Sequence, residues 1–311
     1  MRFSAFHSAI FSLLGAVALC SPAAHAAGYT ETRYPLVLVH GLFGFDNIGP
    51  VDYWYGVAPS LRSGGATVFT SQVSAANSTQ VRGEQLLTEV KRIVAVSGKS
   101  KVNLIGHSHG GPTIRYVATV RPDLVASVTS IGGVNKGSAA ADVLLGVAPP
   151  GSISRDIISK VADGLAKLIS FLSGGAGLPQ NSLAAAQSLS TAGSAKFNAA
   201  HPAGLPFSAC GEGAYQVNGV SYFSWSGGQS YTNALDAIDP ALALTGLVFG
   251  GAKNDGLVSS CSSHLGRVIR DDYAMNHMDE VNHSLGIVHL FETNPLSIFR
   301  SHANRLQNQG L

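Results

Sequence analysis

The sequence predicts one α/β domain built around a mostly parallel β-sheet with helices on both faces. Between residues 30 and 130, short apolar runs alternate with helix-like segments, which is the order typical of such sheets. A Gly-x-Ser-x-Gly motif at residues 106–110 joins one of these strands directly to a helix. The 311 residues are 45% hydrophobic and 12% charged, which is enough for a large core, and no repeat or long linker divides them.

The first 26 residues predict a cleaved export signal. Arg2 precedes an apolar run at residues 9–19, and Ala24 and Ala26 supply small side chains at the cleavage positions. The apolar run is too short to span a bilayer, which argues against a membrane anchor. We therefore expect cleavage after Ala26, a mature domain of residues 27–311, and secretion.

The net charge of +2 gives no case for nucleic-acid binding. We expect the protein to be a monomer.

The strand and helix signals begin with an apolar run at residues 36–39, as expected of a strand buried on both faces. Residues 66–69 predict a second strand, and residues 82–96 predict a helix with one apolar face. Residues 102–105 form the strand before the motif, and residues 125–131 the next one. Together they predict successive parallel strands with crossover helices.

Further along, residues 153–172 predict an amphipathic helix within a region rich in Ala, Gly, Ser and Leu. Pro149-Pro150 and Gly174-Gly175 flank it as possible hinges. Two interpretations stay open: an ordinary surface helix, or a mobile lid over residues 151–174 that covers an apolar site. Strands are predicted again at residues 219–225 and 247–249, and a closing helix at residues 288–306.

The motif at residues 106–110 is typical of a nucleophile elbow. Gly106 and Gly110 allow the close backbone approach of a strand that turns straight into a helix. Ser108 is then held at the tip in a strained conformation with its hydroxyl exposed. A plain Gly/Ser loop is the alternative, but the strand before the motif and the helix after it favour the elbow.

A serine nucleophile needs a base and an acid, which follow it in the chain in the order acid, then histidine. The candidate acids and histidines after Ser108 are Asp236, Asp239, Asp255, Asp271, Asp272, His109, His201, His264, His277, His283, His289 and His302. Asp255 stands out because it lies in a tight Asn-Asp-Gly turn after the predicted strand at 247–249. His277 lies 22 residues later in a polar loop, so Asp255 and His277 form the favoured pair.

The oxyanion of an acyl-transfer intermediate needs two backbone donors. The amide of His109 follows the nucleophile, and the loop after the first strand, His40-Gly41-Leu42, supplies Leu42 as the second donor. His40 is then structural.

Once the leader with Cys20 is removed, Cys210 and Cys261 remain. In an exported protein they predict a disulfide worth roughly 4 kcal/mol, with two free buried thiols as the alternative.

These motifs resemble those of the Pseudomonas/Burkholderia-type secreted triacylglycerol lipases, the foldase-dependent bacterial lipases of family I. The resemblance runs through nearly the whole mature chain, at residues 34–47, 81–87, 101–116, 208–215, 254–258 (NDGLV) and 275–282 (MNHMDEVN). It implies an α/β-hydrolase fold, the triad Ser108, Asp255 and His277, an oxyanion hole from the amides of Leu42 and His109, a Cys210–Cys261 disulfide and a lid.

The same resemblance implies one structural calcium ion and a chaperone partner. The ligands would be the carboxylates of Asp236 and Asp279 and the backbone carbonyls of His283 and Ile287. The chain departs from the family in carrying His at 283 in place of an amide, and in being one residue shorter between Asp236 and Asp255. The resemblance also implies a dedicated membrane-anchored foldase and export through the periplasm.

We therefore expect a lipase that hydrolyses long-chain acylglycerols at a lipid–water interface. A carboxylesterase acting on soluble short-chain esters with the same triad is the alternative within enzymes. An exported lipid-binding protein without turnover is the alternative of another class, and the complete triad argues against it.

Overall fold

A central β-sheet organises the fold. The computed structural model describes residues 28–43, 47–48, 51–148, 153–172 and 178–311, and the predicted leader and both predicted hinges lie outside these residues. The strands run in the order β4-β1-β5-β6-β8-β7, with β9 also paired to β8. All pairs are parallel except β7 with β8. The sheet strands are β1 (Leu36–Val39), β4 (Val68–Ser71), β5 (Val102–His107), β6 (Val125–Ile131), β7 (Gln216–Val217), β8 (Val220–Gly227) and β9 (Arg267–Tyr273).

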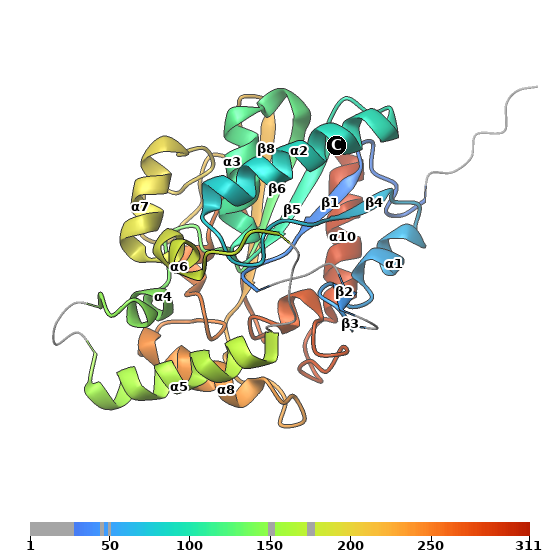
Figure 1. Ribbon diagram of the computed structural model, residues 1–311. Helices are drawn as coiled ribbons and strands as arrows, with labels where there is room; N and C mark the ends of the chain where they lie inside the picture. The colour runs from blue at the N-terminus through green and yellow to red at the C-terminus, as the bar shows by residue number, and fades with distance from the viewer. Residues whose placement is uncertain (1–27, 44–46, 49–50, 149–152, 173–177) are drawn as a thin grey trace, which may run out of the picture.

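Helices cover both faces of this sheet (Figure 1). One buried cluster joins α1 and α10 to Leu36 and Leu38 of β1, and a second joins α2 and α3 to Val37 and Val39. Alternate residues of β1 thus face opposite layers, which explains its uninterrupted apolar sequence. The helices of these two layers are α1 (Val57–Arg62), α2 (Thr79–Ser97), α3 (Gly110–Val120) and α10 (Pro295–Asn308).

Further helices gather beyond the ends of the strands. In Figure 1, α5 and α8 lie side by side along the lower edge, and they pack against each other. The helices of this region are α4 (Ala139–Leu144), α5 (Arg155–Leu172), α6 (Ser182–Leu189), α7 (Thr191–Ala200), α8 (Asp239–Gly246) and the short α9 (Ser260–Ser263). Smaller elements are β2 (Asn47–Ile48), β3 (Val51–Asp52) and the 3₁₀ helices η1 (Pro122–Leu124), η2 (Leu247–Phe249) and η3 (Asp279–Val281). Among the described residues, no helix is long and apolar enough to cross a membrane.

The sequence predictions are confirmed for most elements and wrong for a few. The strands at 36–39 and 125–131 are confirmed at the predicted residues, and the predicted amphipathic helix is confirmed as α5. The strand predicted at 247–249 is wrong: these residues form η2, because three apolar residues cannot distinguish a strand from the end of a helix. The closing helix begins at Pro295 and not at 288, and β9 was not predicted. Its residues, RVIRDDY, are largely half-exposed and charged, so they lack a buried-strand signal.

Candidate active site

The nucleophile elbow forms where β5 ends and α3 begins. Ser108 has a positive φ of 57°, a conformation that costs energy in any residue other than glycine and that the surrounding structure must enforce. A Cβ on Gly106 would lie 2.4 Å from the Gly110 carbonyl oxygen, and one on Gly110 would lie 2.2 Å from that of Val39. Only glycine fits at either position, so the predicted reason for both glycines is confirmed.

Asp255 and His277 meet as the sequence predicts. The Nδ1 atom of His277 lies 2.7 Å from a carboxylate oxygen of Asp255, and the His277 amide donates to the Asp255 carbonyl. The other Asp255 oxygen accepts hydrogen bonds from the Leu257 and Val258 amides, at 2.8 and 2.7 Å. The carboxylate is therefore fixed by its own turn, and it holds the imidazole in one orientation. Asp255 lies in a loop after η2 and does not follow a strand at 247–249.

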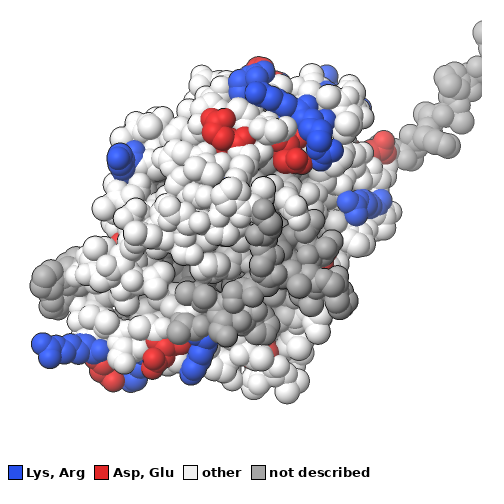
Figure 2. All heavy atoms as spheres, viewed as in Figure 1, with Lys and Arg blue, Asp and Glu red and all other residues white. Residues whose placement is uncertain are grey.

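An apolar cleft brings two of the three predicted triad residues to a common surface. Ser108 and His277 both line this cleft, together with Leu42, Leu257 and Leu165. The Nε2 atom of His277 is buried without a hydrogen-bond partner among the described residues, so it is available to a serine hydroxyl or a substrate. Because Leu165 belongs to α5, the amphipathic helix forms part of the wall of the cleft. Its charged residues lie along the lower edge of the molecule, where Figure 2 shows blue and red atoms.

The loop that carries Leu42 is held against the elbow by a buried arginine that sequence reasoning missed. The guanidinium of Arg82 donates to the His40 carbonyl at 2.6 Å, to the Ser74 carbonyl, and to the Thr113 hydroxyl at 3.3 Å. Burial lowers the pKa of Arg82 to about 9. The Nδ1 atom of His40 lies 2.9 Å from the Gly41 carbonyl oxygen, in agreement with the structural role predicted for this histidine.

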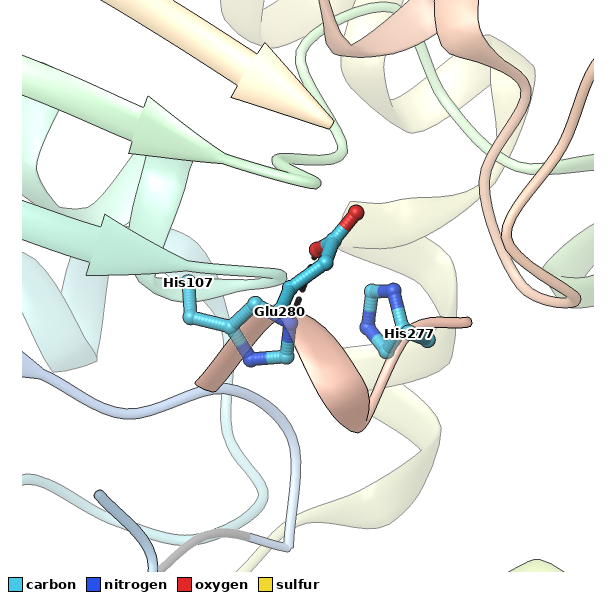
Figure 3. A group of neighbouring side chains, drawn as sticks. All are labelled: His107, His277 and Glu280. Atoms are coloured by element: carbon cyan, nitrogen blue, oxygen red, sulfur yellow. Dashed lines mark ion pairs between the residues drawn. The ribbon is translucent and has the colours of Figure 1, made fainter. Parts of the chain in front are cut away.

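Glu280 is a second site residue that the sequence did not reveal. It is buried one turn after His277, and its Oε1 atom accepts the Gly227 amide at the end of β8. Burial, followed by the nearby Asp255 charge, raises its pKa well above the usual value. Figure 3 shows Glu280 with His107 and His277, and these three side chains approach one another within 4.8 Å. The element η3 places Glu280 here.

A separate acidic cluster lies behind the histidine loop. The Oδ2 atom of Asp279 accepts the Thr232 hydroxyl at 2.6 Å and the Asn276 amide at 3.2 Å, and Asp239 also contacts Thr232 and Asn276. The Oδ1 atom of Asp279 is buried and has no hydrogen-bond partner within the described part of the chain. Burial, reinforced by the charges of Asp239 and Asp236, raises the pKa of Asp279 to about 7.

This cluster fits a calcium ion. Ca²⁺ takes oxygen ligands, and the cluster offers an unpaired carboxylate oxygen among like charges that a cation would offset. The ring of His283 packs edge-on against Tyr53, with centroids 5.6 Å apart, while its carbonyl accepts the Leu285 amide. The side chain is therefore accounted for by packing, so a histidine at this position is compatible with a ligand set that uses only the carbonyl.

The disulfide joins Cys210 and Cys261, whose Cα atoms lie 4.6 Å apart. The alternative of two free thiols is thereby excluded in this structure. The bond ties the segment before β7 to α9, which lies a few residues beyond Asp255 in the chain.

Comparison with known proteins agrees with this geometry. The α/β-hydrolase fold family matches residues 34–281. A triacylglycerol lipase of Vibrio cholerae is 59% identical over 311 residues, covering 100% of this chain and 98% of that protein. Triacylglycerol lipases of Pseudomonas fragi and Burkholderia plantarii are 43% and 40% identical, covering 90% and 100% of this chain and 98% and 97% of theirs.

The chain belongs to the triacylglycerol lipase family of the α/β-hydrolase fold. Among solved structures, Bacillus licheniformis lipase BlEst2 matches with a TM-score of 0.60 at 19% identity, covering 92% of this chain and 96% of that one. Staphylococcus hyicus lipase matches with a TM-score of 0.58 at 18% identity, covering 89% and 97%. At these identities the two structures show the shared fold alone.

Proposed function

We propose that this lipase hydrolyses the ester bonds of long-chain acylglycerols at a lipid–water interface through an acyl-enzyme. The observation that carries the proposal is the apolar cleft, which is lined by Ser108 and His277 and partly walled by the amphipathic helix α5. Such a cleft suits an acyl chain, and a helix with one apolar face suits a lid that turns this face toward lipid.

In the proposed reaction, the Ser108 hydroxyl attacks the ester carbonyl while His277 Nε2 takes its proton. The Asp255 carboxylate fixes the Nδ1–H tautomer and stabilises the imidazolium. His277 then returns the proton to the leaving alkoxide, and water, activated by the same imidazole, hydrolyses the acyl-enzyme. The amides of Leu42 and His109 would bind the oxyanion in both steps.

The proposal includes one structural calcium ion and an export route. Asp236, Asp279 and the carbonyls of His283 and Ile287 would hold the ion, which would stabilise the loop that carries His277 without touching the ester. The predicted leader supports secretion through the periplasm, and the resemblance to the foldase-dependent lipases supports a foldase partner.

The test compares an emulsion of a long-chain triacylglycerol with a soluble short-chain ester, in calcium buffer and with foldase-matured protein. We expect strong hydrolysis of the emulsion by the parent protein, with a rate that rises when substrate passes its solubility limit. The Ser108→Ala variant should lose at least about 10⁴-fold in rate. Activity confined to the soluble ester would favour the carboxylesterase alternative, and an unchanged Ser108→Ala variant would contradict the serine mechanism.

A further inference from the structure

A buried tyrosine, Tyr53, contacts both the oxyanion loop and the residue before the nucleophile. Its hydroxyl accepts a hydrogen bond from the Gly41 amide at 3.1 Å and lies 2.5 Å from Nδ1 of His107. Tyr53 is 2% exposed, and its burial raises the pKa of the phenol above its usual value. The hydroxyl therefore keeps its proton, and it forms a buried hydrogen bond with Nδ1 of His107.

His107 continues this set of contacts toward His277. Its Nε2 atom lies 3.2 Å from the Glu280 carboxylate, and its ring is tilted by 42° against that of His277, with centroids 4.4 Å apart (Figure 3). Burial lowers the pKa of His107 well below its usual value, so the ring is neutral. His107 is the last residue of β5 and directly precedes Ser108, so its position and that of the nucleophile are set together.

The space around Gly41 shows how tightly these groups fit. A Cβ on Gly41 would lie 2.7 Å from both the Tyr53 hydroxyl oxygen and the Ser108 Cβ. The Gly41 peptide is thus enclosed between the tyrosine and the nucleophile, and the next residue is Leu42, the proposed oxyanion donor. A shift of this peptide would move the Leu42 amide relative to the Ser108 hydroxyl.

We propose that Tyr53 and His107 are positioning residues for the oxyanion hole. The Tyr53 hydroxyl fixes the Gly41 peptide, and His107 fixes the hydroxyl, so that the Leu42 amide is already in place when the oxyanion forms. Backbone donors contribute to catalysis because they are preorganised, and a displacement of about 1 Å can cost on the order of 100-fold in rate. This inference rests on the proposed function.

Four variants test the proposal on a soluble short-chain ester, so that adsorption to lipid does not enter. Tyr53→Phe keeps the ring and removes the hydroxyl, and we expect kcat to fall about 10- to 100-fold with KM unchanged. His107→Leu removes the hydrogen-bond partner of the Tyr53 hydroxyl and should act alike, whereas His107→Asn restores a polar partner near the position of Nδ1 and should recover most of the rate. The double variant Tyr53→Phe/His107→Leu should lose no more than either single variant, because both break one chain of contacts.

Thr129→Val is the matched control. The Thr129 hydroxyl and His302 Nε2 form another buried contact, at 2.8 Å, on the same sheet but away from the cleft. This variant should lose stability and keep kcat and KM. The proposal is overturned if Tyr53→Phe keeps kcat within twofold of the parent, if KM rises in place of the fall in kcat, or if Thr129→Val lowers kcat equally. The proposed function fails separately, if Ser108→Ala retains the parent rate.

Discussion

At the scale of single residues, the site contains a strained backbone conformation and a buried carboxylate, and each of them lowers the stability of the folded protein. Ser108 has a φ of 57° and is held by the Ile131 carbonyl, which accepts its amide at 3.0 Å. Asp279 is buried with one oxygen unpaired. Strain and uncompensated charge of this kind concentrate where a protein binds or reacts, since the rest of the fold must stabilise them.

Removal of calcium should therefore destabilise the protein through Asp279. We expect a chelator at pH 8 to lower the melting temperature of the parent, because the carboxylates of Asp236 and Asp279 then ionise without a cation. Asp279→Asn should melt at the same temperature with and without the chelator. The control Asp156→Asn, an exposed residue of α5, should respond as the parent does. A parent protein indifferent to chelation and to added Ca²⁺ would contradict the assignment of this site.

At the scale of elements, the contact between α5 and α8 holds in place the helix that forms part of the wall of the cleft. A Cβ on Gly164 of α5 would lie 2.8 Å from the Ala241 carbonyl oxygen of α8, so glycine lets the two helices approach closely. Val161 and Leu165 on the same side of α5 are buried, while Asp156 and Lys160 on the other side form an exposed ion pair. If α5 is the proposed lid, it would have to separate from α8 along this narrow line of contact.

Gly164→Ala should displace α5 from α8 without unfolding it. Alanine favours the helix by about 1 kcal/mol, but its methyl group cannot fit against the Ala241 carbonyl in the present packing. We expect hydrolysis of the soluble ester to rise several-fold, and the ratio of emulsion to soluble-ester rate to fall. Ser159→Ala, on the exposed side of α5, gains helix propensity alone and serves as the control. Equal ratios in the two variants would show that the contact at Gly164 does not hold the lid.

At the scale of the whole molecule, buried histidines make stability depend on pH. His107, His109 and His302 are enclosed in the core. Burial lowers the pKa of His302 to about 3 and that of the other two well below the usual value. Between about pH 3 and 6.5 the unfolded chain binds more protons than the native protein, so the free energy of unfolding falls as the pH falls.

This dependence can be assigned to one residue with His302→Gln. Each such histidine contributes up to about 1.4 kcal/mol per pH unit in this window, so the variant should show a slope smaller by about one proton. Urea unfolding at pH 7.5, 6 and 5 gives the slope directly. Parallel lines for the parent and the variant would mean that His302 is protonated in the native protein. The urea m-value should stay constant, as a check that the unfolded state has not changed.

The sequence predicted the chemistry of the site better than the arrangement around it. Ser108, Asp255 and His277 could be proposed from the sequence because a nucleophile elbow is a local motif and because its acid and base follow in a fixed order along the chain. Arg82, Tyr53 and Glu280 were missed because their partners lie far away in the sequence: Arg82 contacts His40, and Glu280 contacts His107. The error at 247–249 arose because a short apolar run fits both a strand and a helix end.

The sequence by itself determined the elbow, the parallel strands at 36–39, 102–105 and 125–131, and the amphipathic pattern of α5, since each depends on neighbours within one or two turns of chain. Only the tertiary structure decided that α5 forms part of the wall of the cleft, that Asp236, Asp239 and Asp279 lie close enough for their charges to interact, and that Tyr53 connects the loop before Leu42 to His107. These arrangements depend on which surfaces the folded sheet brings together. Burial shifts the pKa values of these side chains and makes their hydrogen bonds necessary, and burial exists only in the folded chain.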